Sequence, residues 1–414
     1  MARVFPFQPY RYTPQAGRLD HLVTQPYDKI TRPMRERYLE LSPYNLVRII
    51  LGETSPSDND RDNVYTRAAA YLQEWIKRGI LASDREPSLY AYFQEFQDPD
   101  SGQTLVRQGF IGLGAVEDYS EGVVHRHEQT LSGPKKDRLE LLRHTHAHFG
   151  QIFMLYPDPE RAIDGLLQQA SCAAPVCEVE DEYGAAHRLW KISDAAFIRR
   201  VQQLMGPKKL LIADGHHRYE TALAFRNENP SLAGAAKVMM TFVNMHSPGL
   251  RILATHRLVS GLEAFSAEAF LAHAATGFRI RQVESSGALR DAWGRSGEGR
   301  PALGVAIGDR LFLLERAGPD SRLDVAVVHE DLLEGALGIG GDAVREERNL
   351  RYVRGLEFAI EHARQGAAQI AFLLRPVSVE QVADIALSGG VMPQKSTDFY
   401  PKLLSGLTVY RIED

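Results

Sequence analysis

One short segment of the chain, residues 214–218 (DGHHR), has residue types that could bind a phosphate group. The apolar run 210–213 before it predicts a short strand, and residues 219–227 after it are good helix formers. A helix N-terminus presents unpaired backbone N–H groups and about half a positive charge from the helix dipole. We therefore predict an anion-binding corner where this strand meets this helix.

Four residues of this corner are expected to contact phosphates. Gly215 has no β-carbon, so an oxygen ligand can approach its backbone closely. The imidazoles of His216 and His217 add donors, and the guanidinium of Arg218 can bind a phosphate through two hydrogen bonds. The alternative is an ordinary turn in which these side chains make only structural contacts.

Asp214 does not suit a pure anion site, because its carboxylate would repel a phosphate. It could instead coordinate Mg²⁺, cap the helix or accept a proton from a hydroxyl group. We interpret Asp214 as a catalytic residue and as the ligand of an expected Mg²⁺ ion, with a purely structural helix cap as the alternative.

A second polar cluster surrounds the helix predicted at 134–149. Glu128 precedes this helix and is a candidate general base, a role that Asp137 could also fill. Lys135 and Arg138 lie in the first turn and are candidate phosphate contacts. These residues fit the solvated start of an ordinary helix equally well.

Two polar pairs lie where turns meet predicted elements. Tyr27 is followed by Asp28, and Asn45 precedes Arg48 in a stretch, 45–51, that we predict to be a strand. We expect Tyr27, Asn45 and Arg48 to orient a small polar substrate, and Asp28 to be a further candidate for the base.

Lys395 and Ser396 are additional candidates for phosphate binding. They begin a Lys-Ser-Thr tripeptide that follows a Gly-Gly pair at 389–390. The Walker phosphate loop needs a glycine directly before its lysine, and this chain lacks that spacing. We expect the two residues to contribute by closing over the corner from the second half of the chain.

The length and the pattern of elements predict more than one domain. A chain of 414 residues is too long for one ordinary core. Helical and strand-like segments alternate throughout, so the predicted class is α/β or α+β. We expect an N-terminal and central region, 1–261, that carries the corner, and a C-terminal α/β domain, 262–414.

The composition argues against two classes of protein. The formal net charge is -5, whereas nucleic-acid-binding proteins usually have a basic surface, so no nucleic-acid partner is expected. No run of about 18 apolar residues could span a bilayer, and the N-terminus lacks the apolar core of a signal peptide. We expect a cytoplasmic protein with no membrane partner and a possible homo-oligomeric state.

The segment ADGHHRYETA at 213–222 resembles the strand-to-helix motif of the ParB/sulfiredoxin superfamily. Members of that superfamily bind nucleotide phosphates, and the free serine kinases carry the Asp-Gly-His-His-Arg form found here. Sulfiredoxin has a reactive cysteine where this chain has His216, so sulfinic-acid repair is not expected. The resemblance implies a nucleotide-binding core joined to an additional α/β domain.

Across its full length the chain resembles an uncharacterised prokaryotic family, domain of unknown function 1015. The resemblance rests on several blocks spread over nearly the whole sequence: QPYDKI at 25–30, SPYNLVRIILGE at 42–53, HEQTLSGPKKDRLELL at 127–142, ADGHHRYETA at 213–222, THRLV at 255–259, ERNLRYVRG at 347–355 and MPQKSTDFYPKLLSGL at 392–407. Because the family is uncharacterised, the resemblance to it says little about activity.

These features lead to one main hypothesis and two alternatives. The main one is a kinase that uses ATP or ADP, with Mg²⁺, to phosphorylate the hydroxyl of a free amino acid, with serine preferred. The first alternative is a nucleotide-binding regulatory module without turnover. The second is a phosphatase that acts on phosphoserine-like metabolites.

Overall fold

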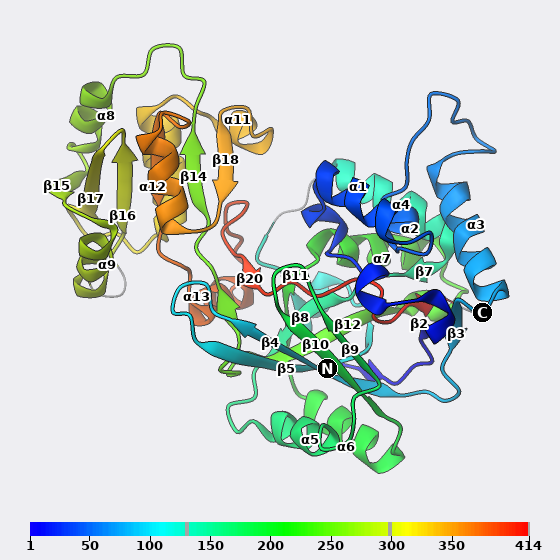
Figure 1. Ribbon diagram of the computed structural model, residues 1–414. Helices are drawn as coiled ribbons and strands as arrows, with labels where there is room; N and C mark the ends of the chain where they lie inside the picture. Colours follow the sequence, from blue (N-terminus) through cyan, green and yellow to red (C-terminus); the bar gives the residue numbers. More distant parts are fainter. Residues whose placement is uncertain (129–131, 297–299, 413–414) are drawn as a thin grey trace. The chain divides into compact units, whose positions relative to one another are not determined.

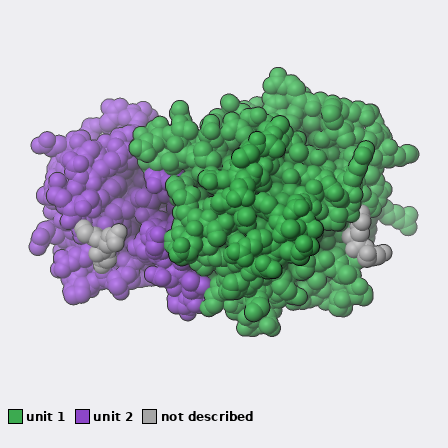
Figure 2. Space-filling view, turned by 90° about the horizontal axis from the view of Figure 1, so that it is seen from below, with its two compact units in different colours: residues 1–250, 401–414 green, residues 251–400 purple. Residues whose placement is uncertain are grey.

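The chain folds into two compact units. A computed structural model describes residues 1–128, 132–296 and 300–412, and the units are Met1–Leu250 with Pro401–Asp414, here unit 1, and Arg251–Tyr400, here unit 2 (Figures 1 and 2). The expected C-terminal domain, 262–414, differs from unit 2 at its start and at its end. The strand β14 (His256–Val259) already belongs to the sheet of unit 2, and the chain returns to unit 1 for its last residues.

Within the described residues, unit 1 is built on a nine-stranded mixed sheet (Figure 1). The strand order is β6-β11-β8-β12-β5-β4-β10-β9, with β1 paired to β5. The pairs β6–β11 and β8–β12 are parallel, and the other pairs are antiparallel. The strands are β1 (Val4–Phe5), β4 (Leu89–Gln97), β5 (Thr104–Ala115), β6 (Val124–His125), β8 (Ile152–Tyr156), β9 (Cys177–Glu180), β10 (Ala186–Ile192), β11 (Leu210–Asp214) and β12 (Lys237–Asn244).

Helices and short strand pairs complete unit 1. Helices α5 and α6 lie side by side (Figure 1) and, together with α7, share a hydrophobic core with the sheet. A second core joins α2, α3 and α4. The α-helices are α1 (Arg32–Leu41), α2 (Val47–Ile50), α3 (Val64–Lys77), α4 (Ser132–Thr145), α5 (Ala162–Ala170), α6 (Ala195–Met205) and α7 (His216–Glu228). The 3-10 helices are η1 (Pro14–Ala16), η2 (Leu19–His21), η3 (Tyr27–Lys29), η4 (Tyr119–Glu121) and η5 (Ala233–Ala236). The strand pairs are β2 (Tyr10–Tyr12) with β3 (Leu81–Ser83) and β7 (Ala147–His148) with β21 (Tyr410–Arg411).

The prediction of a strand at 45–51 was wrong, because α2 occupies most of that stretch. The side chain of Asn45 accepts a hydrogen bond from the Val47 N–H (2.9 Å) and thereby supports the start of this helix. The apolar side chains that suggested a buried strand are the buried face of a one-turn helix.

Unit 2 is an antiparallel sheet with helices on both faces. The order is β15-β17-β16-β19-β14-β18. Leu311 and Leu313 pack with α9 and α12, whereas the alternate residues Phe312 and Leu314 pack with α8 and η6, as the two-residue period of a strand requires. Its further elements are β13 (Arg251–Ile252), β15 (Phe278–Val283), β16 (Ala302–Ile307), β17 (Arg310–Arg316), β18 (Leu350–Val353), β19 (Ile370–Leu373), β20 (Phe399–Tyr400), α8 (Ala267–Ala274), α9 (Ser286–Arg295), α10 (Asp324–Val327), the π-helix η6 (Val328–Ala336), α11 (Gly341–Arg345), α12 (Leu356–Arg364) and α13 (Val379–Leu387).

The predicted class, a mixture of helices and strands, is confirmed in both units. None of the helices in the described part of the chain is long and apolar enough to span a bilayer.

The last residues of the chain are expected to contribute to the stability of unit 1. Val409 is fully buried in the core of α2 to α4 and exchanges two 2.9 Å backbone hydrogen bonds with Tyr10. Val409→Ala should lower the free energy of unfolding by roughly 1–3 kcal/mol, measured by urea denaturation. The matched control Val176→Ala, at a side chain that is 43% exposed, should change it by less than about 0.5 kcal/mol. Equal effects would contradict the docking of this segment.

Candidate functional site

The predicted corner is formed by the end of β11 and the start of α7. Gly215 is the N-cap of α7 and has a left-handed conformation with φ 96°, which favours glycine. A β-carbon at this position would lie 3.1 Å from the guanidinium of Arg218, so a larger residue would crowd that side chain in addition to adopting an unfavourable φ. The helix begins at His216, three residues before the predicted start, and two histidines therefore belong to its first turn.

The carboxylate of Asp214 lies among positive charges. Its Oδ2 is 3.3 Å from Lys402 Nζ, and its Oδ1 is 3.8 Å from Arg218 Nη2. Burial would raise the pKa of Asp214, but the charges of Lys402, Arg218 and Lys29 outweigh burial and hold that pKa well below its usual range. Three cationic side chains thus act on the Asp214 carboxylate.

The expected Mg²⁺ site at Asp214 does not fit these surroundings. Its carboxylate is already balanced by Lys402 and Arg218, and a divalent cation there would be repelled by both. Among the residues that the structure describes, no group of three or more His, Cys, Asp or Glu side chains could hold a metal ion. Asp214 therefore has the geometry of an ion-pair partner.

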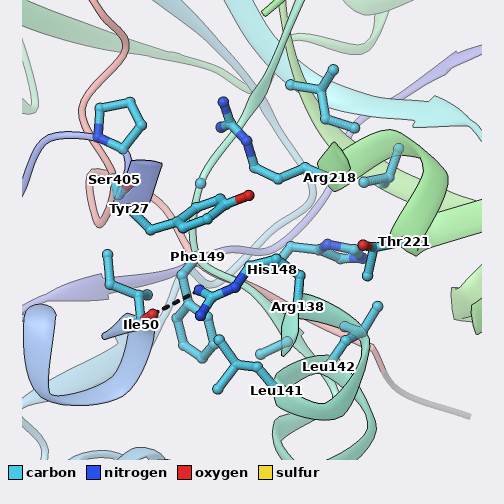
Figure 3. Close-up of a pocket in the computed structure, with 15 residues that line it drawn as sticks. Tyr27, Ile50, Arg138, Leu141, Leu142, His148, Phe149, Arg218, Thr221 and Ser405 are labelled. Atoms are coloured by element: carbon cyan, nitrogen blue, oxygen red, sulfur yellow. Dashed lines mark hydrogen bonds between the residues drawn. The ribbon is translucent and has the colours of Figure 1, made fainter. Parts of the chain in front are cut away.

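Arg218 faces a small cavity beside α7 (Figure 3). Its Nη1 donates a hydrogen bond to the Gln151 carbonyl. The cavity has a volume of about 70 Å³, and Tyr27 and Arg138 also line it. Arg138 lies over the ring of Tyr27, 4.3 Å from its centroid, and donates to the Ile50 carbonyl. Burial, together with the nearby Asp28 charge, raises the pKa of Tyr27 to about 12, so this hydroxyl remains protonated at neutral pH.

His216 does not present a charged donor to a ligand. Its ring is buried against the ring of His127, with centroids 4.7 Å apart, and its Nε2 lies 3.5 Å from the His127 N–H. Burial holds the pKa of His216 well below its usual range and lowers that of His127 to about 4, so both imidazoles are neutral at pH 7. Glu128 adjoins this pair, with Oε2 4.0 Å from His216 Nδ1. The structure therefore brings Glu128 to the corner.

Several candidate residues have structural contacts elsewhere. Lys135 forms an ion pair with Glu220 on α7 at 2.7 Å. Asn45 is fully buried and uses its amide group on backbone atoms, donating to His21 O at 2.8 Å. Arg48 donates to Leu39 O at 3.0 Å. The expectation that Asn45 and Arg48 orient a substrate thus differs from the contacts observed.

The remaining candidates lie in different surroundings. Asp28 is exposed and follows Tyr27 in η3. His217 is partly buried in the first turn of α7. Lys395 and Ser396 belong to unit 2, where the Lys395 carbonyl accepts a hydrogen bond from Arg257.

Sequence reasoning missed Lys402 and the residues that hold it. Arg107 is fully buried and donates to Gln94 Oε1 (2.9 Å) and to the Pro401 carbonyl (2.5 Å). Gln94 in turn donates to the Lys402 carbonyl at 2.9 Å. Because these residues are far apart in the sequence, no local pattern indicated them. The one available signal was a charged residue, Arg107, inside a segment with the alternation of a strand.

The Asp214 ion pairs are expected to make stability depend on pH. A pKa lowered on folding stabilises the native state above the unfolded-state value of about 3.9, and this contribution is lost as the pH falls through the folded-state value. Asp214→Asn should lower the free energy of unfolding by roughly 1–3 kcal/mol at pH 7, and this difference from the wild type should become smaller below about pH 4. Urea denaturation at several pH values measures both.

The control for this titration is Asp62→Asn, because Asp62 is 73% exposed and its pair with Arg67 lies on the surface. The control should change stability little at any pH. A loss of stability in Asp214→Asn that is the same at pH 7 and at pH 3 would contradict the ion-pair assignment.

The chain was compared with protein families, with curated proteins and with solved structures. The profile described as "Protein of unknown function (DUF1015)" matches residues 4–329. Curated proteins gave no match. Similar solved structures include a conserved hypothetical protein from Pyrococcus furiosus (14% identity, 69% of this chain and 91% of that chain, TM-score 0.36). A second is a free serine kinase in complex with AMP (12% identity, 70% of this chain and 88% of that chain, TM-score 0.39). A third is SbnI with a C-terminal truncation from Staphylococcus aureus (11% identity, 72% of this chain and 87% of that chain, TM-score 0.35).

Identities and TM-scores this low transfer no activity to the present chain. The profile match, in contrast, covers more than half of the sequence and includes the whole corner at 214–218. The chain belongs to the DUF1015 family.

Proposed function

We propose that this protein is a nucleotide-dependent kinase that phosphorylates the hydroxyl of a small metabolite, with free serine as the favoured acceptor. The observation that carries the proposal is the excess of positive charge at the start of α7. Arg218, Lys402 and Lys29 act together on the Asp214 carboxylate at the positive end of a helix dipole. Such a site attracts a polyanion such as a nucleotide phosphate.

The phosphates of the donor would bind at the first turn of α7. Gly215 has no side chain with which to cap this turn, and a helix start of this kind offers backbone N–H groups to a ligand. Arg218 already has its guanidinium over Gly215, so it adds charged donors at the same place. Mg²⁺ would enter as part of the nucleotide complex, because the protein lacks a fitting site for it at Asp214.

The cavity beside Arg218 limits what can be enclosed. Its volume of about 70 Å³ is well below the roughly 300 Å³ or more of a typical ligand pocket. In this conformation it could take a group the size of a phosphate. We therefore propose that the phosphate end of the nucleotide is enclosed and that the base lies in the open. The Asp-Gly-His-His-Arg form shared with free serine kinases supports the choice of ADP or ATP as donor.

Glu128 is our choice for the general base. It is partly exposed, and its Oε2 lies 4.0 Å from Nδ1 of His216 in the first turn of α7, so its carboxylate is at the corner where the phosphates would bind. Asp28 is the second choice, since it follows the cavity residue Tyr27 and is exposed to solvent. Proton removal from the acceptor hydroxyl would be the role of either carboxylate.

Arg218→Ala should reduce serine-dependent turnover of ATP or ADP by at least about a hundredfold, since it removes a charged phosphate contact. Phosphoserine formation, measured by mass spectrometry, is the readout. The matched control is Arg226→Ala on the same helix, whose guanidinium donates to the Val116 carbonyl, and it should retain turnover. Wild-type turnover in Arg218→Ala would exclude this site.

Two outcomes would point to the other candidate functions. Nucleotide binding by the wild type without any phosphoserine formed would indicate a regulatory module. Release of phosphate from phosphoserine supplied alone would indicate a phosphatase.

Glu128→Gln should lower kcat by about a hundredfold or more, because the amide cannot accept the proton. Nucleotide affinity, measured by calorimetry, should stay close to that of the wild type, since Glu128 does not contact phosphate in this proposal. Glu121→Gln, at an exposed residue of η4, serves as the control. An unchanged kcat in Glu128→Gln would leave Asp28 as the base to be tested next and would overturn the role of Glu128.

A further inference from the structure

Unit 2 contains a polar cleft that the proposed kinase site does not use. Its volume is about 520 Å³, which falls in the range of small-molecule sites. The cleft is lined by the start of β14, by the segment before and within α10, and by the first turns of α13. Ser396, a candidate from the sequence, also lines it.

The inner wall of the cleft holds a buried arginine with spare hydrogen-bonding capacity. Arg257 is 1% exposed, and its guanidinium donates to two backbone carbonyls, those of Thr255 and Lys395. Its Nε has no hydrogen-bond partner, and no carboxylate among the described residues forms an ion pair with it. Because a buried charge without a counterion is costly, a bound anion would stabilise this position.

Two neighbours of Arg257 also have buried polar atoms without partners in the described part of the chain. The ring of Tyr352 lies 5.3 Å from the guanidinium, and its hydroxyl makes no hydrogen bond. His329 Nε2 is likewise unpaired. Burial, with the nearby charge of Arg257, lowers the pKa of His329 to about 3, so its ring is neutral at pH 7.

Of the three other arginines that line the cleft, Arg300 is exposed to solvent, and the other two are already neutralised. Arg375 forms a two-pronged pair with Asp324, at 2.8 and 2.9 Å. Arg322 pairs with Asp320 at 2.8 Å and with Asp331 at 2.9 Å. Arg257 is therefore the charge of the inner wall that a ligand would balance.

The side of the cleft formed by α13 carries the opposite charge. Glu380 and Asp384 lie one turn apart on α13, and both are exposed. Neither forms an ion pair with a cationic side chain among the described residues of unit 2. A ligand with an anionic end toward Arg257 and a cationic end toward α13 would match both walls.

We propose that this cleft binds a small zwitterion of the amino-acid class, with its carboxylate or phosphate group on Arg257 and its ammonium group on Glu380 and Asp384. The site is separate from the corner at Gly215 and does not depend on the proposed kinase activity.

Calorimetry of the full chain tests the site with three probes: L-serine, O-phospho-L-serine and inorganic phosphate. All titrations use Arg218→Ala as the background, so that the corner in unit 1 does not contribute. We expect one saturable site, with at least one of the two amino acids binding more tightly than inorganic phosphate. Arg257→Gln in this background should weaken binding at least tenfold, and the surface control Arg364→Gln should not.

The double variant Glu380→Gln, Asp384→Asn changes only exposed residues and therefore tests the proposal even if Arg257→Gln fails to fold. It should lower the affinity for L-serine and O-phospho-L-serine at least tenfold and leave the affinity for inorganic phosphate unchanged. Equal weakening of all three probes, no effect on any probe, or no saturable binding of either amino acid would overturn the assignment.

Discussion

The balance of charge around the Asp214 carboxylate is the constraint on which the rest of the corner depends. Without the carboxylate, Lys402, Arg218 and Lys29 would repel one another at the positive end of α7. Without the cations, the carboxylate would lie half-buried and unpaired. The arrangement leaves a net positive charge at a helix start, which is the property that a phosphate site needs.

This balance connects the end of the chain to the corner. Arg107 donates a hydrogen bond to the Pro401 carbonyl, and Gln94 donates one to the Lys402 carbonyl. These bonds fix the backbone from which the Lys402 side chain reaches Asp214. The last strand then pairs with β7, and the bridge between Thr24 and Ser405 secures the same segment. The corner is therefore complete only when the C-terminal residues have docked on unit 1.

The parts of this site that could be predicted from the sequence are local ones. The strand, the glycine and the helix of the corner are encoded within a few neighbouring residues, and the structure has them in that order. Lys402 could not be predicted, because 188 residues separate it from Asp214. The burial of His216 and Asn45 also depends on tertiary packing. A histidine beside a turn has the same local pattern whether it faces a ligand or the ring of His127.

The most direct test of the proposed phosphate site compares the binding of ADP and adenosine to the wild-type protein by calorimetry at low salt. If the corner recognises phosphate, ADP should bind at least tenfold more tightly than adenosine, and its affinity should fall as the salt concentration rises. Equal affinities for the two compounds, or an ADP affinity that does not respond to salt, would contradict the assignment of the corner as the phosphate site.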